Sequence, residues 1–152
     1  MRNPSRYLAQ ACLDVLLLLD DRVDLYSIQG FPLARYGAQY WPTIGRVEGA
    51  SSRINLKDRM ECLFASAVKP HYATWLWIHN EDHGGLSMST ARPDKPEAAP
   101  LYCIASLRFR DLAKHFIAKS IQSNVNTTGT GGYEVTPMHF AVSAGHANIL
   151  SL

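Results

Sequence analysis

The sequence is short of charge and has no long apolar segment. Charged residues make up 18% of its 152 residues, whereas about 25% is usual for a globular domain. The 15 Lys and Arg against 13 Asp and Glu leave a net charge of +2. Such a small net charge is not the basic surplus typical of nucleic-acid-binding domains, so we expect no nucleic acid partner. The longest apolar run, 15–19, is far shorter than the roughly 20 residues of a membrane span, and no membrane partner is expected.

Cysteine is also scarce. The three cysteines, Cys12, Cys62 and Cys103, are far apart, and no CxxC pattern occurs. An odd number without paired spacing excludes a disulfide framework and predicts small, buried thiols in a reducing compartment. The apolar stretch 8–19 is similar to a signal peptide, but Asp14 interrupts it and charged residues stand where cleavage would occur. We therefore expect an intracellular, cytoplasmic protein.

Apolar residues, in contrast, are abundant at 47% and recur at helical spacing, with no alternating strand pattern. The sequence therefore predicts an all-α fold. A helix over 7–19 is apolar on all sides and is expected to be buried. A second helix, 31–41, begins near Pro32 and should be stopped by Pro42. A third near 53–65, capped by Ser51 or Ser52, and a fourth over 71–79 complete the first part of the chain.

Residues 80–98 contain two glycines and two prolines and have almost no apolar period, which predicts a linker. The expected organisation is thus a helical segment 1–79, a linker 80–98 and a helical region 99–152. The helical segment carries five aromatic side chains that could stack on a ligand. We favour the alternative that they form a core shared by two helices, because they fall on helical patterns. They are Tyr36, Tyr40, Trp41, Trp75 and Trp77.

The region 99–152 contains an internal repeat. Residues 100–112 align with 137–149 at an offset of 37, and each copy is a proline-opened short helix, a break and a second short helix. The Thr-Pro-Met-His-Phe-Ala sequence at 136–141 resembles the T-P-L-H-x-A signature of ankyrin repeats. The resemblance implies a hydrogen bond between His139 and Thr136. It also implies an inter-helix turn at Gly145, where glycine permits left-handed geometry.

The first copy departs from this pattern. Ala99, Tyr102 and Arg108 stand where the signature has Thr, His and Gly. These changes predict an atypical first repeat, 99–135, followed by a partial second repeat, 136–152. The fold class is then an irregular helical segment followed by two ankyrin-type helix-turn-helix repeats, the second truncated.

The upstream segments near 7–17, 31–41 and 69–78 resemble the helical region before the ankyrin array of fungal NACHT–ankyrin proteins. This implies that the chain is a fragment of a larger signalling or sensor protein. No P-loop pattern GxxxxGK[ST] is present, so the nucleotide switch of those proteins is absent from this sequence.

The ankyrin resemblance implies a non-enzymatic module that binds another protein or further ankyrin repeats, without a cofactor or a small-molecule substrate. Tyr133 and Glu134, in the finger between the repeats, are candidate protein-binding residues. Arg108 and Arg110, at the first inter-helix turn, are two more.

A metal-dependent hydrolase is the alternative. His79 and His83 are four residues apart, the spacing of the two histidines in HExxH, and His71 could supply a third ligand. However, Asn80 rather than Glu follows the first histidine, and the inverted HxxEH form would need Glu in place of Asp82. We favour a polar helix terminus. The three cysteines lie in apolar patterns and are not expected to act as nucleophiles.

Overall fold

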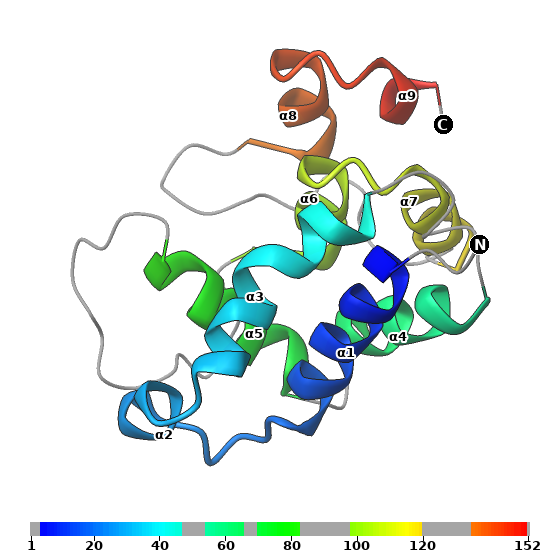
Figure 1. Ribbon diagram of the computed structural model, residues 1–152. Helices are drawn as coiled ribbons and strands as arrows, with labels where there is room; N and C mark the ends of the chain where they lie inside the picture. The colour runs from blue at the N-terminus through cyan, green and yellow to red at the C-terminus, as the bar shows by residue number, and fades with distance from the viewer. Residues whose placement is uncertain (1–3, 47–53, 66–69, 83–97, 120–134, 152) are drawn as a thin grey trace. The chain divides into compact units, whose positions relative to one another are not determined.

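The computed structural model describes residues 4–46, 54–65, 70–82, 98–119 and 135–151, and their regular secondary structure is entirely helical (Figure 1). The expected all-α fold class is therefore confirmed for these ranges. The chain divides into two compact units, 1–96 and 97–152, each described by itself below. No helix within the described ranges is both long enough and apolar enough to cross a bilayer.

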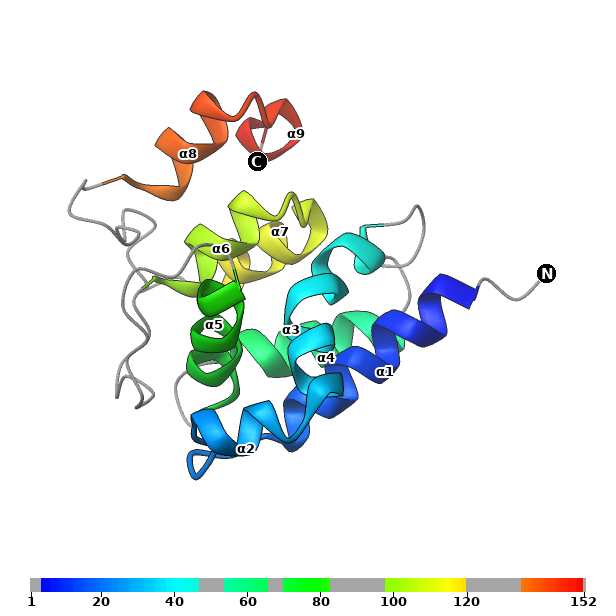
Figure 2. The same cartoon turned by 60° about the vertical axis from the view of Figure 1, so that its left-hand side comes forward.

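The first unit contains the helices α1 to α5. Their bounds are α1 Pro4–Leu18, α2 Leu25–Gln29, α3 Pro32–Gly45, α4 Ile54–Phe64 and α5 His71–Asp82. Helix α1 packs against α3 and α4, and α5 contacts both α3 and α4, as Figures 1 and 2 show. The expected third and fourth helices are thus present, and α5 runs three residues beyond its expected end at His79.

Aromatic side chains from three helices form the centre of this unit. Trp41 of α3, Phe64 of α4 and Trp75 of α5 lie with their ring centroids 5.5–6.2 Å apart, in edge-to-face pairs. Such pairs contribute about 0.5–1.5 kcal/mol beyond the burial of their area. An apolar stripe of α4 at helical spacing is buried around them. It consists of Leu56, Met60, Leu63 and Phe64.

Helix α1 buries only one of its faces. Cys12, Leu13 and Leu16 are at most 1% exposed, whereas Leu8 is 43% and Leu18 80% exposed. The expectation that this helix is buried on all sides is therefore wrong. The leucines on its outer face satisfy the sequence pattern of a buried helix, but only the stripe that faces α3 and α4 is covered.

Helix α3 does not stop at Pro42 but continues to Gly45, so the predicted end is also wrong. Proline has no N–H to donate to the carbonyl of Ala38 four residues earlier. Two side chains of α5 replace that donor: Trp75 Nε1 lies 3.1 Å and His79 Nδ1 3.2 Å from the Ala38 oxygen. Packing against α5 therefore gives the Ala38 carbonyl the hydrogen-bond donors that Pro42 cannot provide.

Helix α2 has no counterpart among the helices predicted from the sequence. Asp24 caps it by accepting hydrogen bonds from the backbone N–H of Ser27 at 2.8 Å and from its hydroxyl at 2.6 Å. These bonds hold the pKa of the exposed Asp24 carboxyl below its ordinary value of 3.8. An aspartate three residues before a serine is a capping signal, but five helical residues carry too little apolar periodicity to stand out.

The second unit contains α6 Pro100–Ser106, α7 Arg110–Lys119, α8 Pro137–Ser143 and α9 Ala147–Leu150. Helix α6 contacts α7 and α8, while α9 contacts α7 and α8. The two helix pairs begin at equivalent positions under the offset of 37, since α6 and α8 start at residues 100 and 137, and α7 and α9 at 110 and 147. The unit is thus two stacked helix pairs.

Candidate protein-interaction site

The turns that join the helices of each pair have the same backbone geometry. Arg108 has a φ angle of 62° and Gly145 one of 67°, and they are equivalent under the offset of 37. In the first turn the amide of Phe109 donates to Ile104 O at 3.2 Å, and in the second the amide of His146 donates to Ala141 O at 2.8 Å. The first turn therefore adopts the left-handed conformation even though its central residue is arginine rather than glycine.

Further hydrogen bonds repeat in the same register. The hydroxyl of Ser106 donates to Cys103 O at 2.8 Å, and that of Ser143 donates to Phe140 O at 3.0 Å. The sequence alignment that pairs these serines thus corresponds to a structural equivalence, bond for bond.

The helix starts differ between the pairs. Thr136 caps α8 by accepting from the His139 amide at 3.3 Å, and its hydroxyl lies 3.1 Å from His139 Nδ1. This is the bond that the signature implies. Ala99 provides no side-chain cap to α6. Tyr102, at the histidine position, instead packs edge-on against Phe140 with centroids 5.5 Å apart, and partial burial raises the pKa of its phenol.

The two pairs are also joined directly by side chains. His146 Nδ1 lies 3.1 Å from the carbonyl oxygen of Ala105, and Arg110 Nε donates to Asn148 O at 3.0 Å. The sequence pattern predicts no role for His146 or Asn148. The offset of 37 aligns His146 with Phe109, so comparison of the two copies could have singled it out as a polar residue at a buried position.

Among the predicted protein-binding residues, Arg108 and Arg110 both lie exposed at the first turn. The structure brings them together at the start of α7, although the Nε of Arg110 is engaged with Asn148. Tyr133 and Glu134 lie outside the described residues. The described part of the predicted surface is therefore a turn with two exposed guanidinium groups.

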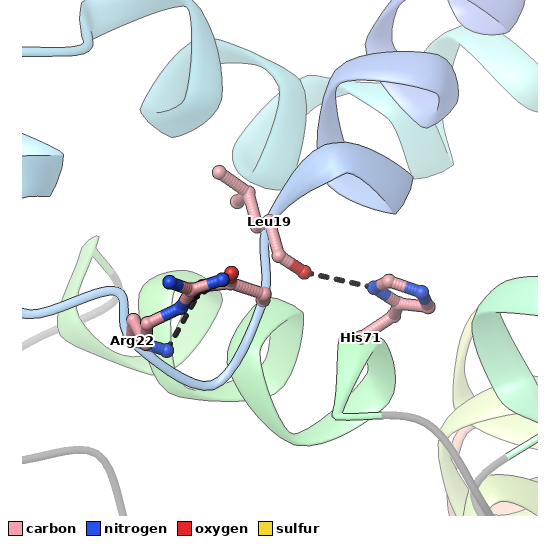
Figure 3. A network of polar contacts seen from close by, with 4 residues as sticks. Leu19, Arg22 and His71 are labelled. Carbon is pink, nitrogen blue, oxygen red and sulfur yellow. Dashed lines mark hydrogen bonds and ion pairs between the residues drawn. The ribbon is translucent and has the colours of Figure 1, made fainter.

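Two histidines of the alternative metal site, His71 and His79, lie within the described residues. His71 Nδ1 lies 2.9 Å from the carbonyl oxygen of Leu19 (Figure 3), and His79 Nδ1 contacts Ala38 O. Both rings are thus turned toward backbone carbonyls, that of Leu19 just after α1 and that of Ala38 in α3, with their Nδ1 atoms as donors. His83 lies outside the described residues. Within the described ranges no three His, Cys, Asp or Glu side chains cluster in a way that could hold a metal ion.

Two expectations about side-chain burial need correction. Cys12 and Cys103 are buried as predicted, and burial raises the pKa of the Cys12 thiol, but Cys62 is exposed on the outer side of α4. Trp41, Trp75 and Trp77 are buried in the core, whereas Tyr36 and Tyr40 are about 40% exposed and contact each other with centroids 4.8 Å apart. Helical spacing marks the faces of a helix but does not show which face is covered.

Comparison of the sequence with protein-family models finds no match, and comparisons with curated proteins and with solved structures find none either.

Proposed function

We propose that the second unit is a pair of ankyrin-type helix-turn-helix repeats and that the protein is a non-enzymatic protein–protein interaction module. The proposal is supported by the bond-for-bond equivalence of the two turns and by the Thr136–His139 contact at the start of α8. Repeats of this kind expose one edge of successive turns, which suits them to binding an extended partner surface.

The proposed binding site rests on the backbone conformation of Arg108. A left-handed backbone costs a non-glycine residue about 1–2 kcal/mol, and the equivalent position in the second pair is glycine. The Arg108 side chain is exposed and makes no hydrogen bond with another of the described residues. Residues held in such backbone conformations cluster at functional sites. We therefore infer that an arginine occupies this position because its side chain takes part in binding.

Guanidinium groups favour carboxylates because they bind them through two parallel hydrogen bonds. Arg108 and Arg110 therefore indicate an acidic segment of the partner protein as the feature recognised at this turn.

The test compares the proteins captured by the wild-type chain with those captured by Arg108→Gly. Glycine suits the backbone at this position, so the variant keeps the fold and loses only the side chain. Lys114→Ala, which removes an exposed positive charge from α7, is the matched control. We expect a partner that the wild type and Lys114→Ala both bind and that Arg108→Gly loses by at least tenfold in affinity when measured with purified components. Equal binding by all three proteins would contradict the proposed site.

A further inference from the structure

Helices α1 and α3 of the first unit carry outward-facing residues in the same register. The two helices lie alongside each other and run in opposite directions (Figures 1 and 2), and Gly37 of α3 packs directly on the backbone of Cys12 of α1. Counted from these two contact residues, each helix has exposed or half-buried residues at the same four offsets. They are Leu8, Ala11, Val15 and Leu18 on α1, and Leu33, Tyr36, Tyr40 and Thr43 on α3.

This common register places both rows on one side of the helix pair. In two antiparallel right-handed helices, positions at the same offset from two facing residues lie on the same side of the line of contact. Spacings of three and four residues also keep each row on a single face of its helix. The two rows, Thr43 apart, are apolar or aromatic. We call this surface the α1–α3 face, and the buried contact between Gly37 and Cys12 lies beneath its middle.

The α1–α3 face exposes an unusually large apolar area. Six large side chains on it and at its α1 edge are 40–80% exposed, namely Tyr7, Leu8, Leu18, Leu33, Tyr36 and Tyr40. At about 100 Å² for each, they leave about 600 Å² accessible, which is the upper end of what a monomeric protein exposes in one patch. Two such faces together would bury about 1,200 Å², the area at which stable protein–protein interfaces begin.

The α1 side of the face offers almost no charge for a partner to recognise. Asp14 is the one charged side chain that the structure describes on α1, and it is paired with Arg59 of α4 in the same chain. A helix that lies on a membrane carries several basic residues along its polar edge, whereas the α1 sequence contains a single one, Arg6. Two copies of this helix, in contrast, can approach without repulsion between like charges.

The row on α1 is also symmetric in the size of its side chains. Leu8 and Leu18 stand at its ends, and the smaller Ala11 and Val15 lie between them. When two such helices pair antiparallel about a two-fold axis, each Leu8 faces Leu18 of the second copy and each Ala11 faces Val15. A dimer with two-fold symmetry requires a self-complementary surface of this kind.

We propose that the α1–α3 face is the interface of a homodimer, in which two copies of the chain pair through antiparallel α1 helices. A second copy is the occupant because it matches the row on α1, brings no opposing charge and doubles the apolar area to what a dimer needs. The inference concerns the first unit and is independent of the binding role proposed for Arg108 in the second.

The experiment measures the mass of the full chain by sedimentation equilibrium over a wide range of protein concentration. We expect a reversible monomer–dimer equilibrium. Leu8→Glu and Leu18→Lys, both at exposed positions, should each weaken dimerisation by about tenfold or more, since each places a charge against a leucine. A mixture of these two variants should dimerise more strongly than either alone, because the pairing sets Glu at position 8 against Lys at position 18 of the other copy.

Val142→Lys is the matched control, since it places a charge at an apolar position of the second unit that is 60% exposed. It should dimerise as the wild type does, and circular dichroism should show that all variants keep their helix content. A wild-type chain that stays monomeric, or that binds neutral lipid vesicles as a monomer, would overturn the proposal. Dimers that survive both single variants, that are lost with Val142→Lys, or that the mixture does not restore would overturn it as well.

Discussion

At the residue scale, the two left-handed turns form an internal comparison. Arg108 and Gly145 share a backbone conformation and differ in side chain. A side chain added at Gly145 would meet no heavy atom within 4 Å, so any cost there comes from the backbone alone. Substitutions at these two positions therefore measure the free-energy cost of the left-handed backbone for a single non-glycine residue.

We expect Arg108→Gly to raise the free energy of unfolding by about 1 kcal/mol and Gly145→Ala to lower it by a similar amount. Urea denaturation followed by far-UV circular dichroism would measure both. Destabilisation by Arg108→Gly would show that the arginine makes a stabilising contact, and would remove the basis for its proposed role in binding.

A second residue-scale prediction concerns the cap of α2. Because the folded pKa of Asp24 lies below its ordinary value of 3.8, its contribution to stability is fully present above that value. The contribution is lost as the pH falls through the folded pKa. We expect protection of the Ser27 amide to decline over this acidic range, as followed by NMR hydrogen exchange. Asp24→Asn keeps a capping oxygen without a titrating group, so its Ser27 protection should not show this decline.

At the element scale, the packing of α3 against α5 involves one backbone carbonyl group, that of Ala38. Pro42 removes the intrahelical donor to Ala38 O, and Trp75 and His79 of α5 replace it. The indole and imidazole rings also stack, with centroids 5.3 Å apart. These contacts explain why a proline that sequence rules place at a helix end lies inside this helix.

We expect Trp75→Phe and His79→Ala each to destabilise the protein by about 1 kcal/mol or more. The double variant should lose more than the sum of the single effects, because it leaves the Ala38 carbonyl without either donor. Adding Pro42→Ala provides a backbone N–H for that carbonyl. It should therefore stabilise the double variant more than it stabilises the wild type, and equal effects of Pro42→Ala in both backgrounds would contradict this account.

A close approach between α1 and α3 is the other feature at this scale. A side chain at Gly37 would lie 3.3 Å from the Cys12 carbonyl oxygen, which belongs to the α1 backbone. We expect Gly37→Leu to destabilise the first unit by about 3 kcal/mol through overpacking. Gly30→Ala, where the nearest atoms are 3.6 Å away, is the matched control and should have little effect. Thermal unfolding would compare the two.

At the scale of the whole molecule, local sequence rules predicted the helical class and the turns of the second unit. Proline at the first turn of α6 and α8 and apolar spacing in α4 are signals that act over a few residues. The continuation of α3 past Pro42 and the exposure of Cys62 and Tyr40 depend on which neighbouring helix covers which face. That information is carried by contacts between residues such as Trp75 and Ala38, 37 positions apart, and periodicity within one helix does not contain it.

The candidate site was predictable only in part, for a related reason. Alignment of the two internal copies places Arg108 at the turn. Its left-handed backbone, on which the proposed binding role rests, is visible only in the structure.

The position of the tryptophans has an optical consequence. All three, Trp41, Trp75 and Trp77, belong to the first unit and are buried there, and the second unit has none. Indole emission should therefore be blue-shifted in the native protein and should move to longer wavelength only when the first unit unfolds. Ellipticity at 222 nm reports on the helices of both units. A denaturation curve recorded with both signals should thus distinguish the two units in the unmodified chain, without a label or a substitution.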